Sequence, residues 1–194
     1  MSTLFCSRAR LIVLAVASPL LAQQPAEGIK NFYQVDQHLY RGAQPDKEGI
    51  EFLAKLGVKT VINLRGEGPE SRREEKLVTE AGMKYIHVPM TGLTPPTVTE
   101  IQKILGLLED QTGGAVFVHC KRGADRTGTV IAAYRVDHDG WDNDQALKEA
   151  MTRGMSPLQH PRQHYIREFQ RVTAGVTAPL NPLAAASPSA AIAQ

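Results

Sequence analysis

The ten-residue segment from His119 to Gly128, HCKRGADRTG, brings together a cysteine, glycines and arginines in a pattern suited to phosphate chemistry. It follows a continuous apolar run and precedes a helical pattern, so backbone amides and a helix N-terminus surround one point. Such a point is an anion site, and Arg126 adds a planar, two-pronged donor that fits phosphate oxygens. Cys120 opens the same segment, where the helix dipole and the arginine charge favour the nucleophilic thiolate. The segment therefore offers a phosphate cradle with a nucleophile aimed at its centre.

The other residues of this segment suit the same purpose. Gly123 can adopt backbone conformations that other residues resist, and Gly128 lets the following helix pack closely. Lys121 and Arg122 give the rim a basic character that suits a polyanionic substrate, although ordinary solvated charge is the alternative for both. The predicted phosphate-binding residues are Lys121, Arg122, Gly123, Ala124 and Arg126.

Two arginines outside the segment, Arg41 and Arg65, are second-tier candidates for contacting substrate. Arg65 ends a predicted strand at the ligand edge and could meet a second phosphate, or it could form a salt bridge to a nearby glutamate. His160 and His164 are four residues apart, but Pro161 places His160 at a helix start, so no metal site is expected. The charged run 71–76 (SRREEK) is interpreted as a solvated helix face with local ion pairs.

Strand-like and helix-like patterns alternate through the middle of the chain and must position these residues. The alternation predicts an α/β domain with a mainly parallel central sheet flanked by helices, joined by right-handed crossovers. In such sheets ligands collect beyond the carboxyl ends of the strands, where the cysteine segment falls. Strands are predicted at 32–36, 38–40, 58–64, 83–89 and 115–118. Helices are predicted at 46–56, 69–81, from Pro95 or Thr97 to about 110, and at 127–137, 142–153 and 161–172.

The spacing Cys120-x5-Arg126, preceded by His119 and followed by Thr127-Gly128, resembles the signature of the protein tyrosine and dual-specificity phosphatase superfamily. The segments 38–45, 58–65 and 85–89 extend the resemblance to the compact atypical dual-specificity phosphatases of bacteria, plants and fungi. The HCKRG start is similar to the plant and fungal group, which includes enzymes acting on inositol pyrophosphates and on phosphoproteins. The resemblance implies a phosphatase-type phosphate-binding loop between a central strand and a helix.

This resemblance also implies roles for the catalytic residues. Cys120 would attack phosphorus and form a thiophosphoryl intermediate, while Arg126 and the loop amides would stabilise the transition state. Thr127 would stabilise the leaving thiolate in the second step. His119 would orient the loop and support a low pKa of Cys120, the alternative being a satisfied core histidine.

The usual general acid of the family is absent at its usual place. Family members carry an aspartate on a loop about 30 residues before the cysteine, but 87–94 (HVPMTGLT) holds no Asp or Glu. The best replacement is Asp125, which is similar to the loop aspartate implicated as the acid in some bacterial and lipid-directed members. The alternative is that Asp125 caps a helix that starts near Thr127. Glu67 and Glu70, which follow the strand ending at Arg65, are weaker candidates for the general acid.

The ends of the chain are predicted to lie outside the catalytic domain, 23–176. Two arginines precede the apolar run 11–22, which is shorter than the roughly 20 residues of a membrane span, so 1–22 is interpreted as a signal peptide. An uncleaved N-terminal anchor is the alternative. Residues 177–194 are rich in Ala, Pro and Ser and are interpreted as a disordered tail. An exported protein, periplasmic or secreted, is therefore expected, with Cys120 as its one thiol after cleavage.

Composition narrows the function further. The 22 Lys and Arg residues nearly balance the 20 Asp and Glu residues, which argues against a nucleic-acid partner. We expect a metal-independent cysteine phosphatase without a cofactor, acting on a phosphorylated protein or a small polyanionic phosphate, with no stable membrane insertion after signal cleavage. A catalytically weak or inactive phosphate-binding pseudophosphatase is the alternative, favoured by the missing upstream acid. A rhodanese-type sulfur transferase also uses a loop cysteine, but the Arg126-Thr127-Gly128 ending argues against it.

Overall fold

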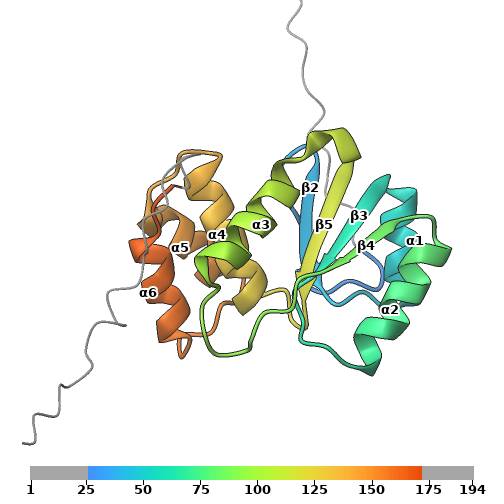
Figure 1. The fold of residues 1–194 in the computed structure, drawn as a ribbon, viewed down its shortest axis with the longest axis horizontal. Helices are drawn as coiled ribbons and strands as arrows, with labels where there is room; N and C mark the ends of the chain where they lie inside the picture. Colours follow the sequence, from blue (N-terminus) through green and yellow to red (C-terminus); the bar gives the residue numbers. More distant parts are fainter. Residues whose placement is uncertain (1–25, 172–194) are drawn as a thin grey trace, which may run out of the picture.

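The computed structural model describes residues 26–171, which form a five-stranded sheet of order β1-β2-β5-β3-β4 with helices on both faces (Figure 1). The expected signal peptide and C-terminal tail lie outside the described residues. The strands are β1 (Tyr33–Gln34), β2 (Leu39–Ala43), β3 (Val58–Asn63), β4 (Lys84–His87) and β5 (Ala115–Cys120). The helices are α1 (Lys47–Lys55), α2 (Pro69–Glu80), α3 (Val98–Glu109), α4 (Asp125–Asp137), α5 (Asn143–Thr152) and α6 (His160–Glu168), with a 3-10 turn η1 (Gln111–Gly113).

The sheet is parallel except at one edge. Strand β1 pairs antiparallel with β2, whereas β2, β5, β3 and β4 run parallel to their neighbours. The carboxyl ends are level, because Ala43 pairs with Cys120 and Asn63 pairs with His119. All four ends therefore meet at one edge, which is the lower edge in Figure 1. This confirms the expected α/β fold with a mainly parallel sheet.

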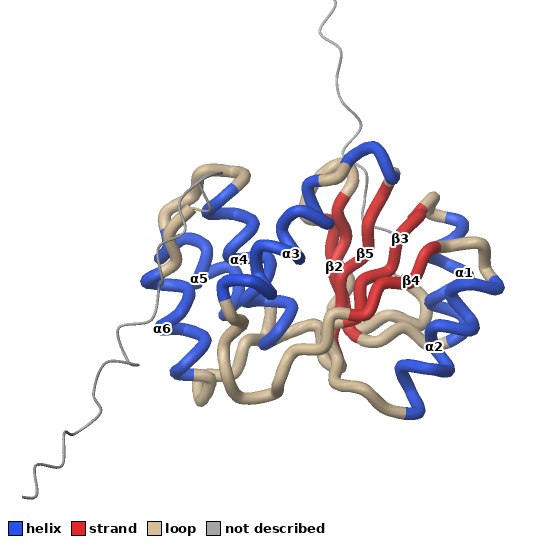
Figure 2. The backbone as a smooth tube through the Cα atoms, viewed as in Figure 1, coloured by secondary structure: helices blue, strands red, loops and turns tan. Residues whose placement is uncertain are grey.

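Two apolar layers enclose the sheet, and the side chains of β5 point alternately into one layer and the other. Phe117 points into a cluster with Leu53 of α1 and Val78 of α2. Its neighbour Val118 points to the opposite face and joins a larger cluster with Ile131 of α4. Helices α1 and α2 accordingly cover one face, and α3 to α6 cover the other (Figure 2). Successive residues at the end of β5 therefore face different layers of the molecule.

Local capping explains where several helices begin. The Asp46 side chain accepts a hydrogen bond from the Gly49 amide and caps α1. Thr97 and Glu100 form a capping box at the start of α3, which decides between the two starts that the sequence left open. Within residues 26–171, no helix has the length and apolar character needed to cross a membrane.

Several element ends differ from the sequence prediction, among them that of β2, which covers 39–43 instead of 38–40. Strand β5 extends to Cys120 because its last residues remain paired with β2, and α4 begins at Asp125 rather than Thr127. Helix α6 ends at Glu168, well short of residue 172. Its end is fixed by Asn143 of α5, whose side chain donates hydrogen bonds to the carbonyls of Ile166, 2.7 Å, and Phe169, 2.8 Å. A contact from another helix leaves no trace in the local pattern.

Candidate active site

The loop between β5 and α4 turns at Gly123, whose backbone lies in the left-handed region with φ of +64°. A Cβ atom at this position would lie 2.3 Å from the carbonyl carbon of Gly42 and 2.6 Å from the amide nitrogen of Ala43. The loop therefore packs backbone to backbone against the end of β2. Only glycine satisfies both the turn and the close approach.

Two side chains hold this turn from behind through its carbonyl group. Arg41, on β2, donates a hydrogen bond from Nη2 to the Gly123 carbonyl at 2.6 Å, and Asn31 donates to the same oxygen at 2.9 Å. Asn31 also bonds to the carbonyl of Arg153 at 2.9 Å, which ties the loop to the end of α5. Arg41 is fully buried, and this burial lowers its pKa to about 10. The structure thus places Arg41 as a support of the loop rather than on its open side.

Cys120 is a free, buried thiol that ends β5 and faces the α4 layer. Burial alone raises its pKa, but the hydroxyl and amide of Thr127, the charge of Arg126 and the amide of Arg122 oppose it. The net effect is a pKa below the ordinary value of a cysteine. The thiolate, which is the nucleophilic form, is therefore favoured at this position.

Arg126 and Thr127 occupy the first turn of α4, which begins two residues before the start that the sequence predicts. Arg126 donates from Nη1 to the carbonyls of Leu64, at 3.2 Å, and Met90, at 3.4 Å. Its guanidinium therefore spans the segments that follow β3 and β4, at the carboxyl edge of the sheet. Thr127 is fully buried, its hydroxyl makes no hydrogen bond within the described residues, and its presence helps to lower the pKa of Cys120.

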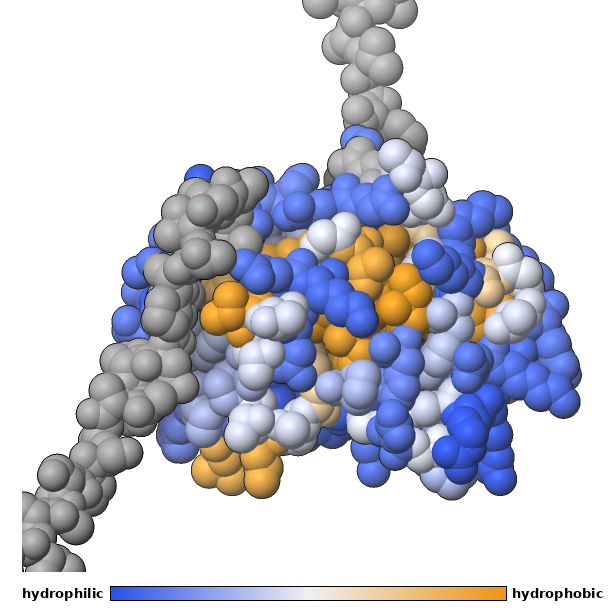
Figure 3. All heavy atoms as spheres, in the orientation of Figure 1, coloured by the Kyte–Doolittle hydropathy of each residue, from blue (hydrophilic) through white to orange (hydrophobic). Residues whose placement is uncertain are grey.

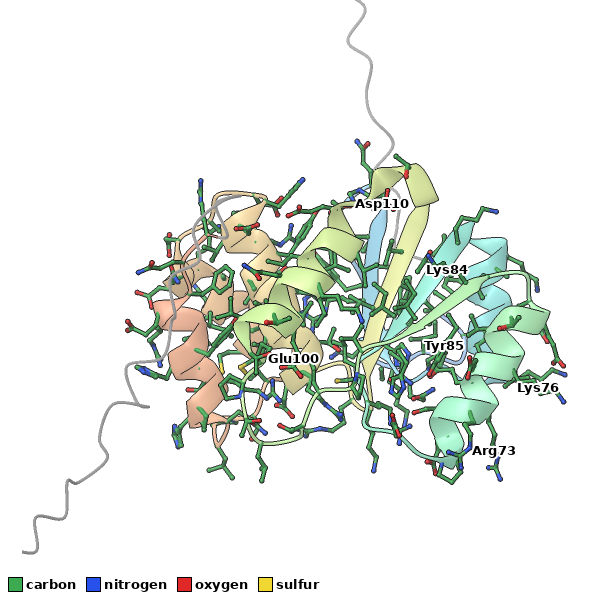
Figure 4. The ribbon with its side chains drawn as sticks, viewed as in Figure 1. Arg73, Lys76, Lys84, Tyr85, Glu100 and Asp110 are labelled. Carbon is green, nitrogen blue, oxygen red and sulfur yellow. The ribbon has the colours of Figure 1, made fainter. Side chains whose placement is uncertain are left out.

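His119 faces the opposite layer and meets a buried carboxylate. Its Nε2 atom lies 2.9 Å from Oε1 of Glu74 on α2, and both side chains are almost fully buried. The two atoms do not have the geometry of a hydrogen bond, so the contact is a close approach of an imidazole and a carboxylate within the core. Oε2 of Glu74 accepts a hydrogen bond from Asn63 at 2.6 Å, and Asn63 also donates to the hydroxyl of Tyr85 at 2.8 Å. Tyr85 lies between the sheet edge and α2 (Figure 4).

This pair corrects the interpretation of 71–76 as a wholly solvated helix face. Ser71 and Glu74 point inward at 6% and 3% exposure, while Arg72, Arg73 and Glu75 are exposed. The Glu74 carboxylate therefore points into the core, because its partners His119 and Asn63 lie there. Sequence reasoning missed Glu74, since a buried and a solvated glutamate look alike in a charged helix.

Asp125 does not cap α4 in the way the sequence alternative supposed. It is the first residue of the helix, whose N-cap is Ala124, and no side-chain cap is present there. Instead its Oδ1 atom accepts a hydrogen bond from the Ser156 amide at 2.8 Å, and its Oδ2 atom pairs with Arg122. Asp125 thus joins the cysteine loop to the segment between α5 and α6.

The rim residues take different positions. Lys121 and Arg122 are exposed, as expected for a basic rim, and Arg122 is engaged by Asp125. Arg65 follows β3, donates a hydrogen bond to the Gln44 side chain at 2.9 Å, and lies 4.0 Å from the carboxylate of Glu70. The ion pair between Arg65 and a glutamate that the sequence offered as an alternative is therefore present, at the long separation of 4.0 Å.

A further arginine, which sequence reasoning missed, lies next to the site. Arg162 of α6 is fully buried and donates from Nη2 to the carbonyl of Thr91 at 2.6 Å. Burial and the neighbouring charge of Arg126 lower its pKa, while Asp125 and Cys120 act in the opposite direction. Arg162 thus adds positive charge near the thiol and fixes the segment that follows β4. The pattern HPRQHYIRE gives no hint of this burial.

The segment after β4 carries no carboxylate, as its sequence requires. Its start is anchored by the amide of Met90, which donates to the Leu64 carbonyl at 3.2 Å. Asp110 lies at the opposite edge of the molecule from Arg73, so the end of α3 is remote from the cysteine loop (Figure 4). Among residues 26–171, no group of three or more His, Cys, Asp or Glu side chains is placed to hold a metal ion.

A buried, acidified thiol, an arginine and a glycine turn at the carboxyl edge of a parallel sheet define a phosphatase-type site, and comparison with known proteins agrees. The chain belongs to the family described as PTP-NADK, DSP-PTPase phosphatase fused to NAD+ kinase, whose family model matches residues 21–168. It is thus a member of the atypical dual-specificity phosphatase group that the sequence resembles.

Two curated relatives illustrate the range of this group. The dual specificity protein phosphatase TpbA of Pseudomonas aeruginosa is 33% identical over 141 residues, covering 72% of this chain and 61% of TpbA. The phosphatidylglycerophosphate phosphatase PTPMT2 of Arabidopsis thaliana is 29% identical over 143 residues, covering 72% of this chain and 62% of PTPMT2. The chain thus spans about three-fifths of the length of these two curated relatives.

Solved structures show the same architecture. The core catalytic domain of the PP-IP phosphatase SIW14 from S. cerevisiae matches with a TM-score of 0.63 at 26% identity, covering 73% of this chain and 86% of that domain. A structure of P. aeruginosa TpbA in complex with pTyr matches with a TM-score of 0.58 at 25% identity, covering 75% and 91%.

Proposed function

We propose that this protein is a cysteine-dependent, metal-independent phosphomonoester hydrolase that works through a cysteinyl-phosphate intermediate on Cys120. The single observation that carries the proposal is the thiol itself. It is buried at the start of a glycine turn, its pKa lies below the ordinary value, and Arg126 stands in the first turn of the following helix. A structural cysteine in an apolar core would have its pKa raised instead.

In the proposed first step, the Cys120 thiolate attacks phosphorus, an S–P bond forms and the bond from phosphorus to the leaving oxygen breaks. Arg126 and the amides of 121–124 bind the phosphoryl oxygens as charge develops on them. The leaving oxygen takes a proton. In the second step, water attacks phosphorus and gives a proton to the carboxylate left by the first step, the S–P bond breaks, and inorganic phosphate and the thiolate are released. Thr127, whose hydroxyl lowers the pKa of Cys120, stabilises the departing thiolate.

Asp125 is the proposed proton donor, because the segment after β4 holds no acid. It begins α4, one residue before Arg126, and its side chain is 14% exposed. Both of its oxygens are already engaged, by Arg122 and by the Ser156 amide. For proton donation, the contact between Asp125 and Arg122 therefore has to open when substrate binds.

His119 and Arg41 act as supports in this proposal. His119 precedes the nucleophile and is fixed by the buried carboxylate of Glu74, 2.9 Å away. Arg41 holds the glycine turn through the Gly123 carbonyl, 2.6 Å away. Neither side chain reaches the open side of the loop, since both are fully buried. They set the geometry that the reacting groups need.

The substrate class follows from the relatives only as a range. A solved complex of TpbA holds pTyr, SIW14 is named for a PP-IP phosphatase activity, and PTPMT2 is named for a lipid phosphomonoester. A phosphorylated protein or a small polyanionic phosphate therefore fits the site. The side chains of Lys121 and Arg65 would contact charges beyond the reacting phosphate, because Lys121 is exposed and Arg65 lies outside the loop, after β3.

A phosphate-binding pseudophosphatase is the second candidate. One observation favours it: the usual acid is missing from 87–94, and the carboxylate of Asp125 is held in two contacts. Such a protein would bind oxyanions at the same loop but would turn over slowly or not at all.

The deciding experiment is hydrolysis of an aryl phosphate in EDTA and reductant, with a Cys120→Ser variant alongside. The proposal expects activity that vanadate inhibits and that the variant lacks, while the folded variant still binds tungstate. A requirement for metal, or turnover by the variant, would refute the cysteine mechanism. A folded, inactive parent that binds tungstate would favour the pseudophosphatase.

Export is a separate proposal, which rests on the sequence of residues 1–22 alone. Determining the N-terminal residue of the protein isolated from its own cell tests it directly. An N-terminus at or near residue 23 supports cleavage and export, and an intact residue 1 in a cytoplasmic fraction refutes it.

A further inference from the structure

Two leucines stand out from the otherwise well-packed apolar residues. Leu93 is 77% exposed and Leu158 is 82% exposed, and the next large hydrophobic side chain among the described residues, Leu56, is 38% exposed. Leu93 lies in the segment between β4 and α3, and Leu158 lies in the segment between α5 and α6. A single exposed leucine is ordinary, but exposed apolar side chains that gather on one surface mark a site of interaction.

Hydrogen bonds hold the backbone beside both leucines in place. The Thr91 hydroxyl accepts from the Thr94 amide at 3.1 Å, and Arg162 fixes the Thr91 carbonyl. Gln163 donates to the carbonyls of Ser156, at 3.1 Å, and Pro157, at 3.0 Å. These bonds make the two turns fixed projections of the surface.

The two turns are also joined to each other and to the active site. Gln159 donates a hydrogen bond to the Gly92 carbonyl at 3.2 Å, one residue away from each leucine. The Ser156 amide binds Asp125, and Arg126 bonds to the Met90 carbonyl. Both leucine turns therefore border the loop that carries Cys120. Figure 3 shows a small apolar patch at the lower edge of the molecule, beneath α6, on the edge where the strands end.

Both signs of charge are exposed on this edge, and three of its cations have no ion-pair partner among the described residues. Lys121, Arg72 and Arg73 are exposed, and none makes an ion pair with another described residue. Arg73 lies at the lower end of α2, on the edge that carries the leucine turns (Figure 4). Glu67 and Glu70 are also exposed near this end of α2, and Arg65 lies 4.0 Å from Glu70. Free cations thus accompany the apolar projections.

We propose that this edge docks the protein on an anionic membrane surface, with Leu93 and Leu158 entering the interface and the cysteine loop facing the headgroups. Projecting apolar side chains beside free cations fit a lipid interface, in which the apolar groups are buried and the cations meet anionic headgroups. A peptide partner would instead need a concave pocket for its side chains. Docking of this kind is peripheral and needs no membrane-spanning helix.

The inference deepens the proposed function, on which its catalytic part rests. Docking places the phosphate site at the depth of the headgroups, so a lipid phosphomonoester becomes the favoured substrate class. The reacting phosphate would enter from the membrane side while the acyl chains stay in the bilayer. The binding part of the inference does not depend on activity.

The binding test uses the full chain and vesicles of phosphatidylcholine with phosphatidylglycerol. The Leu93→Ser, Leu158→Ser double variant is compared with the parent and with Leu56→Ser, which removes a surface leucine at the opposite edge of the sheet. All three proteins carry the same terminal segments, so the contribution of those segments cancels in the ratio. We expect the partition coefficient of the double variant to fall at least about tenfold, and that of Leu56→Ser to stay within about twofold of the parent. Equal partitioning of the double and control variants would overturn the proposal.

The activity test compares phosphatidic acid in the same vesicles with a soluble aryl phosphate and a phosphotyrosine peptide. The double variant should lose at least about tenfold on the vesicle substrate and keep the rates on both soluble substrates. A parallel loss on all three would assign the leucines to loop support, and a loss on the peptide alone would assign them to a protein substrate; either result overturns the proposal. If the parent hydrolyses nothing, the proposed function fails, and the partition ratio still decides the docking.

Discussion

Replacing Gly123 by alanine tests the geometry of the site most directly. The residue has φ of +64°, where an L-residue with a Cβ atom is strained by roughly 1–2 kcal/mol. The new Cβ would also lie 2.3 Å from the carbonyl carbon of Gly42, although contacts below 3.0 Å essentially never occur. The end of β2 cannot yield, because it is paired with β5 on one side and β1 on the other. The loop must therefore move.

The displacement needed is about 1 Å, the difference between the clash and an ordinary contact. A shift of that size at a catalytic centre costs on the order of 10²-fold in rate. It would also weaken the hydrogen bonds from Arg41 and Asn31 to the Gly123 carbonyl, each worth roughly 1 kcal/mol. We expect Gly123→Ala to lower kcat/KM for an aryl phosphate about a hundredfold or more, and to lower the unfolding free energy by roughly 2–4 kcal/mol.

The matched control is Gly66→Ala. Gly66 lies in the segment after β3, near the same edge, and a Cβ there meets no atom within 4 Å. This variant should keep both activity and thermal stability close to those of the parent. Turnover and thermal unfolding are measured on the same preparations, so that a folding defect is distinguished from a displaced loop. If Gly123→Ala retains activity within about threefold of the Gly66→Ala control, the steric argument is wrong.

Three other substitutions give separate predictions. Thr127→Ala removes a group that lowers the pKa of Cys120, so the thiolate should form only at higher pH. The acid limb of the pH profile of kcat/KM and the pH profile of thiol alkylation should both shift to higher pH. Unchanged profiles would contradict the role given to Thr127. Glu74→Ala leaves buried His119 without its partner, so the free energy of unfolding measured in urea should fall by about 3–5 kcal/mol. The control Glu75→Ala, at an exposed neighbouring position, should change it by less than about 0.5 kcal/mol. Asp125→Asn keeps an amide oxygen that can accept the hydrogen bond from the Ser156 amide, but it cannot donate the proton. A larger rate loss for an alkyl phosphate than for an activated aryl phosphate would therefore identify Asp125 as the proton donor. Equal losses for the two substrates would show that Asp125 has a structural role only.

The sequence was sufficient for the parts of the site that local patterns encode. The apolar run of β5, the glycine turn and the start of α4 are contiguous, so the sequence alone places Cys120, Arg126 and Thr127 near a strand end and a helix start. The order of strands and helices followed from alternation, and the fold from that order. The family comparison then confirmed the class of protein.

The supports of the site could not be found in this way, because each depends on a partner distant in the chain. Glu74 sits in a run of charged residues and is buried only because His119 and Asn63 lie opposite it. Asn31 and Arg162 belong to no recognisable motif, and their roles appear only when their carbonyl partners are known. Periodicity reports which face of an element is apolar, but it does not report a single polar residue that turns inward.

The hydrogen bonds to the Gly123 carbonyl also determine at which stage of folding the site can form. Arg41 and Asn31 stand 82 and 92 residues before Gly123, and Asn31 reaches forward 122 residues to Arg153. Contacts of such long range form late in folding, since loop closure must come before the contact is gained. The phosphate cradle is therefore completed only once the first strands and the end of α5 have come together. A nascent chain, or a fragment nicked between them, would hold the cysteine motif in full and still have no rigid cradle for an anion.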